Sequence, residues 1–560
     1  MTKTKRYIAF ALAIASLAVS SCRLASGELT YDEAAESLKA LLKKVDYSDE
    51  SSYITASDPH DAIVGRQMPD ISTYPLTAKG DGSIDVEIAS STEKAVADTD
   101  SVKTDSWLLH MALAFNAQMP TINGQTVSVS IRPLASGTAT DYILSGEYVP
   151  EAFTPSNELW AEMIKSKGIP IEMAAKRLCG NTAGLLIKPE AYEMMLEKYT
   201  EITMQTALKA VIAGDLLMGY TNPYTSSTGL NNLICMLYAI DPQNLTSEKA
   251  ASELSAFQAL IPSTSYTTAE LINKAANGTL DCLSMEYQAY SFKSEFRDWK
   301  FIPFGVRHDS PIYTIGNISE EKRQALSLFI DFCLRPENQA EAKAKYGFNE
   351  FDSYSAESMP IDGGMLIQAQ SIWKKAKDAG RPVIAVFIAD ESGSMEGTPI
   401  KELKTSLKHA SQYISSTNYI GLVGYSSDVR IYLPVSRFEA AQRNKFLNAV
   451  DYLSASGSTA TYNAILVGLE MLVNAKKEVP NAKLMMFVLS DGDSTKGSRY
   501  YAFEKVEPVI RGLGIPIHAL GYNVSNNELK ELAAINEASY IGTSMDDIVY
   551  QLKNIFNAQM

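Results

Sequence analysis

Residues 383–390 read VIAVFIAD, an unbroken run of strand-forming apolar residues that ends in an acid. Such a strand, apolar on both faces, is typical of a parallel sheet that helices cover on both sides. Ligands of these open sheets bind beyond the carboxyl ends of the strands. Asp390, Ser392 and Ser394 stand at that end, at alternate positions, so the stretch predicts both a fold and a binding site.

Apolar strands and amphipathic helices alternate through the rest of the C-terminal third. This order predicts a doubly wound, Rossmann-like α/β domain with a mostly parallel sheet over residues 378–560. The further strands are expected at 420–426, 430–435, 483–491, 515–522 and 538–542, and the helices at 400–414, 438–453, 463–475, 526–535 and 545–557.

Two more polar segments are expected at the same edge of this sheet. KLMMFVLSD is a second apolar strand ending in an acid, Asp491, and the loop SASGSTATYNAI brings Thr459 to the start of a helix. Carboxylate and hydroxyl oxygens suit a hard divalent cation, and magnesium keeps part of its water shell, so one position stays open to an outside oxygen. The residues predict a Mg²⁺ or Mn²⁺ site; the alternative is that they serve only as helix caps and turns.

The segments DESGS, Thr459 and SDG, in this order, resemble the metal-ion-dependent adhesion site of the von Willebrand factor A (VWA) domain. The resemblance covers about residues 378–560. It implies that Ser392, Ser394 and Thr459 bind the metal directly, that Asp390 and Asp491 act largely through water, and that a protein partner supplies a carboxylate. Ser458 stands where the family often has a second glycine.

Residues 81–350 form another α/β region, whose length suits two lobes better than one. The polar loops ASSTE, LASGTATDYILSG and GYTNPYTSSTGLNNL resemble those of a type 2 periplasmic solute-binding protein, as do YVPEAFTPSNELW and PENQAEAKAKYGF. The resemblance implies a small solute bound between the lobes, although each loop could equally serve as a helix cap. The residues expected to face the cleft are Ser91, Thr92, Ser136, Thr138, Thr225, Ser226 and Glu286. One long helix is expected from Ser319 to about Tyr346.

The N-terminus has the pattern of a secretory signal: basic residues precede the apolar run from Tyr7 to Val19. VSSC resembles a bacterial lipobox, which implies cleavage before Cys22 and an acyl anchor on that cysteine. We therefore expect a lipoprotein of the bacterial cell envelope, held outside the cytoplasm by lipid alone; the alternative is a plain signal peptide. Residues 1–22 are the expected signal, 23–80 a tether with one helical stretch, YDEAAESLKALLKKV, and 351–377 a linker that passes into a helix leading to the C-terminal domain.

Composition narrows the function. A net charge of −15 without a basic stripe argues against nucleic acid. No phosphate loop, nucleophile elbow or zinc-protease motif is present, so we expect no catalysis, with a hydrolase as the remaining enzyme alternative. Four cysteines, at 179, 235, 282 and 333, could pair or stay as thiols. The preferred function is cation-dependent binding of a protein partner; the alternative is a solute-binding receptor of an ABC-type transporter with a VWA docking domain.

Overall fold

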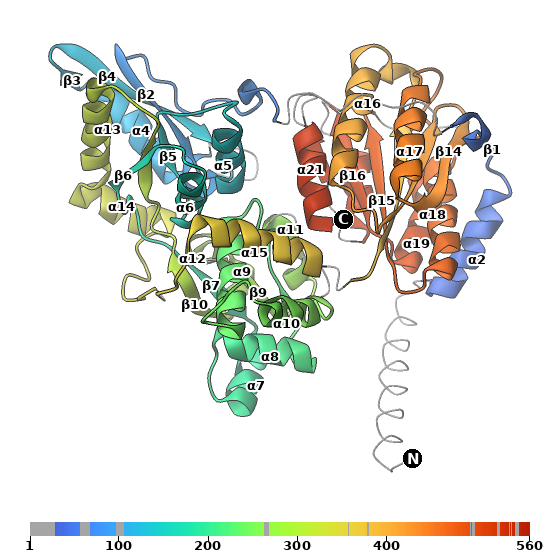
Figure 1. Cartoon of the computed structure of the whole chain (residues 1–560), viewed down its shortest axis with the longest axis horizontal. Helices are drawn as coiled ribbons and strands as arrows, with labels where there is room; N and C mark the ends of the chain where they lie inside the picture. The colour runs from blue at the N-terminus through green and yellow to red at the C-terminus, as the bar shows by residue number, and fades with distance from the viewer. Residues whose placement is uncertain are drawn as a thin grey trace. The chain divides into compact units, whose positions relative to one another are not determined.

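The structure is a computed structural model. The chain folds into two compact units (Figure 1). The central unit comprises residues 68–380, with residues 553–559 grouped with it. The C-terminal unit comprises residues 381–552 together with the described N-terminal residues 29–55. The expected signal peptide and Cys22 lie outside the described residues. The structure describes residues 29–55, 68–96, 106–261, 268–356, 358–377, 380–492, 494–495, 499–522, 527–536, 538, 540–543 and 548–559.

The C-terminal unit is built on a seven-stranded sheet in the order β1-β14-β13-β12-β15-β16-β17 (Figure 1). Neighbouring strands are parallel except β13 and β14, which form an antiparallel hairpin. The predicted doubly wound α/β domain is confirmed. The strands are β1 (Tyr47–Asp49), β12 (Val383–Asp390), β13 (Tyr419–Tyr425), β14 (Val429–Arg437), β15 (Lys483–Ser490), β16 (Ile517–Tyr522) and β17 (Tyr540–Thr543).

Strand β12 lies in the interior of this sheet, and every one of its eight residues is buried. Phe387 stacks on Phe487 of β15 with ring centroids 5.0 Å apart. Helix α18 (Thr461–Glu478) packs on the sheet face, and Gly468 allows its close approach: a Cβ there would lie 2.7 Å from Cδ1 of Ile388. The other helices are α16 (Thr398–Ala410), α17 (Ala440–Tyr452), α19 (Phe503–Leu513), α20 (Asn527–Ala534) and α21 (Ile548–Gln559).

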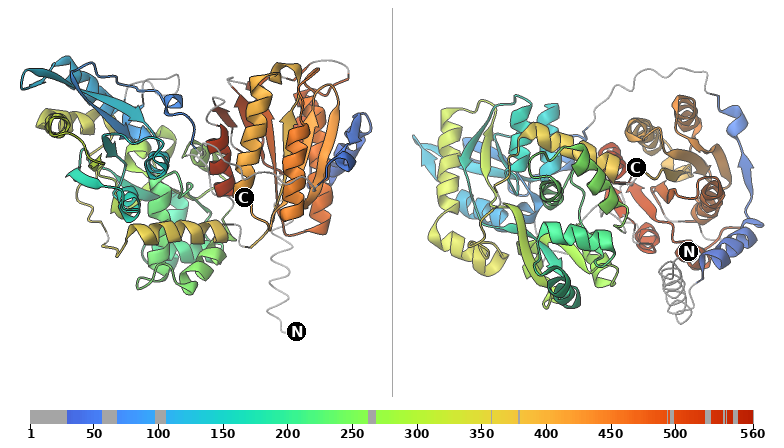
Figure 2. Two further views of the ribbon diagram at one scale, coloured as in Figure 1. Left: turned by 45° about the horizontal axis from the view of Figure 1, so that its top comes forward. Right: turned by 60° about the horizontal axis from the view of Figure 1, so that its bottom comes forward.

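Part of the segment that we expected to be a tether is folded into the C-terminal unit. Helix α2 (Tyr31–Leu42) begins with a capping box between Thr30 and Glu33 and buries Leu38 in the same core as α18 and α19. Strand β1 then pairs in parallel with β14 at the edge of the sheet. Figure 2 shows α2 and β1, in blue, along that side of the unit. The C-terminal unit is therefore discontinuous in sequence.

Removing the buried side chain of α2 tests this packing. We expect Leu38→Ala to lower the unfolding free energy of the C-terminal unit by about 3 kcal/mol, because it leaves a cavity in a closed core. All four tryptophans, at 107, 160, 299 and 373, lie in the central unit. Tryptophan fluorescence should therefore be unaffected, while circular dichroism detects the earlier transition. Lys43→Ala, at an exposed position of the helix end, is the control; equal effects of both changes would contradict the packing.

The central unit contains two sheets, which agrees with the predicted two-lobed module. The first sheet has the order β3-β4-β2-β5-β11-β6 and the second β10-β7-β9-β8. The first comprises β2 (Ile84–Ser90), β3 (Thr121–Ile122), β4 (Gln125–Pro133), β5 (Ala152–Thr154), β6 (Ile171–Ala175) and β11 (Ile312–Ile315). The second comprises β7 (Thr182–Ile187), β8 (Met218–Gly219), β9 (Cys282–Glu286) and β10 (Lys300–Arg307).

Helices cover both sheets, and the chain crosses between the sheets at two short connections. Residues 176–181 lead from β6 to β7, and residues 308–311 lead from β10 to β11. The helices used below are α3 (Thr92–Ala95), α5 (Ser136–Ser145), α6 (Leu159–Ser166), α9 (Ser227–Ile240), α10 (Glu248–Gln258) and α12 (Tyr287–Ser291). The remaining ones are α4 (Trp107–Ala117), α7 (Pro189–Tyr199), α8 (Met204–Ala213) and α11 (Thr268–Ala276).

One expectation about a helix in this unit differs from the structure. The long helix expected from Ser319 to Tyr346 is two helices, α13 (Glu320–Cys333) and α14 (Pro336–Tyr346). Pro336 explains the break, because a proline disfavours helical geometry in the residue before it. The expected linker 351–377 contains α15 (Gly363–Ala376), which packs on α6, α9 and α10 and donates a hydrogen bond from Trp373 Nε1 to Tyr220 Oη (2.6 Å).

The four described cysteines are buried thiols without a disulfide. Burial raises the pKa of Cys179 to about 12 and that of Cys282 and Cys333 well above the ordinary thiol value. Among the helices that the structure describes, none combines the length and the apolar character that crossing a membrane requires.

Burial of these thiols predicts chemical inertness. Native protein at pH 8 should react negligibly with a thiol reagent, because the thiolate is the reactive form and is disfavoured inside the core. Denaturant should release four thiols from the central unit, and a fifth reactive group, Cys22, should appear only in protein whose N-terminus carries no lipid. Rapid reaction of native protein at one of the four positions would contradict the buried arrangement.

Candidate functional site

Asp390 ends β12 with both carboxylate oxygens engaged inside the protein. Oδ1 accepts a hydrogen bond from the backbone N–H of Ser392 (2.8 Å), and Oδ2 accepts one from Ser490 Oγ (2.5 Å). Ser490 is the last residue of the neighbouring strand β15, so the two strand ends are joined at this carboxylate. Burial raises the pKa of Asp390, and the nearby charge of Asp491 adds to the increase. A cation beside this carboxylate would offset both effects.

The two motif serines and the second acid form a chain of direct contacts. Ser392 Oγ lies 3.0 Å from Ser394 Oγ, and Ser394 Oγ donates to Asp491 Oδ1 (2.8 Å). Ser392 is buried, Asp491 is half-buried and Ser394 is exposed, so the chain leads from the core to the surface. The structure thus brings together four of the five residues predicted for the metal.

Thr459 is positioned by bonds that its loop makes to both other segments. Gly393 N donates to Gly457 O (3.0 Å), which ties the Thr459 loop to the motif after β12. Thr459 N donates to Thr495 Oγ1 (2.9 Å), and Thr495 N returns a bond to Thr459 O (2.9 Å), which ties it to the segment after β15. All three predicted loops therefore meet at one edge of the sheet.

Glu391 joins the motif after β12 to the loop that carries Thr459 and to strand β14. The sequence analysis did not predict this role. Its carboxylate is fully buried and accepts bonds from Ser454 N (2.7 Å) and from Tyr432 Oη (3.1 Å), with Arg430 Nη1 at 3.5 Å. A Cβ at Gly424 would lie 2.2 Å from Glu391 Oε2, so only glycine fits there. Glu391 lies between Asp390 and Ser392 in the motif, and its bonding partners Ser454 and Tyr432 are distant in sequence, so the sequence gives no local signal of its burial. Ser490 and Thr495 were also missed, since their partners are distant in sequence.

The donor set fits a hard divalent cation. Two carboxylates and three hydroxyls lie on or beside the meeting loops, and oxygen is the donor that Mg²⁺ and Mn²⁺ prefer. Within the described residues, no group of three or more His, Cys, Asp or Glu side chains could hold a metal ion by itself, so a cation at this edge would need the hydroxyls as well as the two acids. The arrangement depends on hydroxyls and only two acids, which matches a site with an open outer position.

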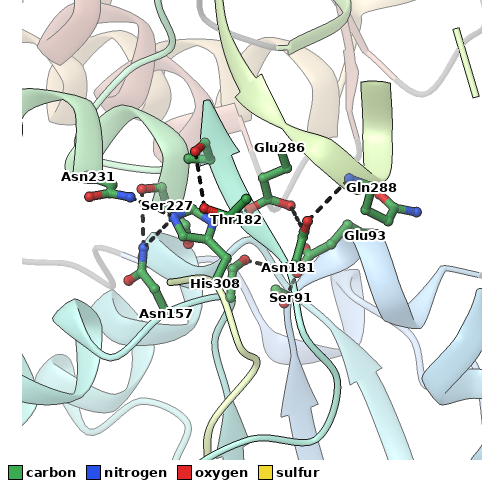
Figure 3. A network of polar contacts seen from close by, with 12 residues as sticks. Ser91, Glu93, Asn157, Asn181, Thr182, Ser227, Asn231, Glu286, Gln288 and His308 are labelled. Carbon is green, nitrogen blue, oxygen red and sulfur yellow. Dashed lines mark hydrogen bonds and ion pairs between the residues drawn. The ribbon is translucent and has the colours of Figure 1, made fainter. Parts of the chain in front are cut away.

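A second polar network lies in the central unit, where the chain crosses between the two sheets (Figure 3). His308, fully buried after β10, is its centre: Nδ1 lies 2.6 Å from Glu286 Oε1, and Nε2 lies 3.0 Å from Asn157 Nδ2 and 3.1 Å from Asn231 Nδ2. Asn181 on the other crossing donates from Nδ2 to Glu286 Oε2 (3.1 Å). One imidazole therefore joins residues of both sheets.

The hydrogen bonds of Asn231 determine the tautomer of His308. The Asn231 side chain is bonded to Val306 on both sides, with Nδ2 donating to the carbonyl (3.0 Å) and Oδ1 accepting from the N–H (3.1 Å). The atom facing His308 is therefore the amide nitrogen, so Nε2 of His308 must accept. The proton then lies on Nδ1 and is donated to the Glu286 carboxylate.

The predicted cleft residues divide between this network and ordinary structural roles. Glu286 bonds His308; Ser91 Oγ donates to Glu93 Oε1 (2.6 Å); and Ser136 Oγ accepts from Ser156 N (3.3 Å). The other four make no contact with the His308 network that the structure records. Thr92 is exposed on α3, Thr138 is buried in α5, Thr225 accepts from Gly137 N through its carbonyl (3.3 Å), and Ser226 caps α9 by accepting from Gly229 N (3.2 Å).

Comparison with known proteins identifies the C-terminal region: residues 385–558 match the von Willebrand factor type A domain, so this chain contains a VWA domain. Inter-alpha-trypsin inhibitor heavy chain H3 of Bos taurus is 28% identical over 172 residues, which are 28% of this chain and 19% of that protein. The chain thus matches about a fifth of that relative's length.

Solved structures show likeness of fold alone. The vWF domain of the type V pili tip protein Mfa5 from Porphyromonas gingivalis is 12% identical and covers 31% of this chain and 94% of that chain, with a TM-score of 0.25. A periplasmic thiamin binding protein is 13% identical and covers 52% of this chain and 96% of that chain, with a TM-score of 0.36. The domain assignment of this chain therefore rests on the VWA match at residues 385–558.

Proposed function

We propose that the protein binds a partner protein through a divalent cation, held at the edge of the VWA sheet by Asp390, Ser392, Ser394, Thr459 and Asp491. The observation that supports this most directly is the chain of contacts from buried Ser392 through exposed Ser394 to Asp491, at the point where three loops meet. Mg²⁺ or Mn²⁺ would supply a positive centre with an exchangeable position, and the residues would orient that position toward solvent.

An acidic side chain of the partner suits the open position, because a carboxylate adds charge-assisted attraction to the metal. We further propose that the chain acts at the outer side of a bacterial membrane, anchored by lipid on Cys22. The proposal assigns no catalytic step: Asp390 and Glu391 are both buried and engaged in structural hydrogen bonds, so neither is available as a general base. The transport-receptor alternative assigns the main role to the central unit instead.

Direct metal titration tests the site. Full-length protein should bind Mn²⁺ at one strong site, measured by electron paramagnetic resonance of the free ion, and Mg²⁺ should compete. We expect Asp491→Ala to weaken Mn²⁺ binding at least tenfold, because it removes one of the two carboxylates. Asp451→Ala, which removes an exposed acid of α17 bonded to Lys408, is the charge-matched control. Equal Mn²⁺ affinity in wild type and Asp491→Ala would refute the site.

Partner chemistry can be tested with the metal in place. Mn²⁺ on the protein should enhance water proton relaxation through its coordinated waters. Adding a short peptide that contains aspartate should reduce this enhancement, because a carboxylate displaces water from the open position. The same peptide with asparagine is the matched control, and EDTA should abolish the response. A peptide effect that persists in EDTA would contradict cation-dependent binding.

A further inference from the structure

In the central unit, hydrogen-bond donors from the residues after β2 and after β5 form a cradle around one carboxylate of the chain itself, that of Glu93. Glu93 Oε1 accepts hydrogen bonds from Ser91 Oγ (2.6 Å) and from Ser156 Oγ (2.9 Å). Lys94 Nζ lies 3.5 Å from the same oxygen and also donates to Thr154 O (2.9 Å). Two hydroxyls and an ammonium thus converge on a single acid oxygen. Figure 3 shows Glu93 beside Ser91.

Lys94 makes an anion necessary at this position. Its side chain is completely buried, and an ammonium taken out of water is strongly unfavourable unless a negative charge is close. Glu93 supplies that charge from the neighbouring position in sequence. Burial raises the pKa of Glu93, but the Lys94 charge and the two hydroxyl donors outweigh burial and hold that pKa below its ordinary value. The carboxylate therefore remains ionised inside the cradle.

The cradle belongs to the same network that joins the two sheets. Ser156 donates to Glu93, and its neighbour Asn157 donates to His308. His308 in turn bonds Glu286 of the second sheet. The side-chain donors Ser91, Ser156 and Asn157, which a solute-binding module could offer to a solute, are therefore bonded within the protein.

The two halves of the central unit, each built on one of its sheets, are also in direct contact. Trp160 Nε1 of α6 donates to Ser227 Oγ of α9 (2.9 Å), and Gly137 N donates to Thr225 O (3.3 Å). A Cβ at Gly137 would lie 2.2 Å from Tyr224 O, so the backbones approach too closely for any side chain at 137. Helix α15 contacts α6 and also α9 and α10, so it connects helices of both halves of the central unit.

We propose that Ser91, Ser156 and Lys94 form a carboxylate-binding site whose occupant is the chain's own Glu93. The class of ligand that these donors suit is a small carboxylate or another oxyanion. With Glu93 in place, these donors are already bonded to a carboxylate of the chain and are not free for a solute carboxylate. The proposal is independent of the metal site, because it concerns only residues of the central unit.

Substitution followed by rescue tests the cradle in full-length protein. Tryptophan fluorescence during heating reports the central unit, because all four tryptophans lie there. We expect Glu93→Ala to lower the Tm of this transition by several degrees, because Lys94 is left buried without an anion. Sodium formate should then raise the Tm of Glu93→Ala with increasing concentration, as expected for a ligand that binds only the folded state. Sodium chloride at equal ionic strength should raise the Tm of Glu93→Ala much less than formate does.

Glu93→Gln is the matched control. The amide fills the same space as the carboxylate but carries no charge, so the Tm of Glu93→Gln should fall below that of wild type. Because the amide leaves no space for formate, formate should not raise this Tm. Wild type should respond equally to formate and chloride, because Glu93 already occupies the donors. If Glu93→Ala does not fold, its refolding yield in formate against chloride is measured instead, with recovery expected in formate alone.

Several results would overturn the proposal. An unchanged Tm in Glu93→Ala would show that Lys94 does not need this carboxylate. A formate effect in wild type as large as that in Glu93→Ala would show that an external anion reaches the donors while Glu93 is present. Equal recovery of Glu93→Ala and Glu93→Gln, or refolding that does not depend on the anion, would show that formate acts elsewhere.

Discussion

Complete burial of β12 is the constraint on which the C-terminal unit depends. Because neither face of the strand meets water, sheet neighbours must flank it and helices must cover it, and only its carboxyl end is left to meet loops. The polar residues after Ala389 are therefore held at one edge. Asp390 accepts a hydrogen bond there from Ser490 of the adjacent strand. This bond links the motif after β12 directly to the motif after β15.

Much of this could be predicted from the sequence because its signals are local. A strand that is apolar throughout and ends in an acid can be recognised from about ten consecutive residues. The serines that follow it belong to the same short stretch. Glu391, Ser490 and Thr495 could not be predicted in the same way, since their importance comes from Ser454, Asp390 and Thr459, which are brought close only by folding. The packing of α2 was missed for the same reason: an amphipathic helix shows an apolar face but not the surface that covers it.

The two polar sites differ in how their charges are balanced. In the C-terminal unit, Asp390 and Asp491 approach each other without a basic partner in the contacts described, and an outside cation is the natural complement. In the central unit, Lys94 and Glu93 are neighbours and neutralise each other. Sequence analysis expected Ser91 to bind a solute, whereas its hydroxyl donates to Glu93; Ser156, the second hydroxyl donor, was not predicted. The acid that accepts both bonds stood within the short motif ASSTE, two residues after Ser91.

The discontinuity of the C-terminal unit has a consequence for biosynthesis. Helix α2 and strand β1 are translated first, yet the strands and helices that bury them are translated only after residues 68–380. Leu38 and its apolar neighbours must therefore remain without their partners while the entire central unit emerges and folds. Until the C-terminal segment is present, α2 and β1 expose an apolar surface to which a chaperone could bind.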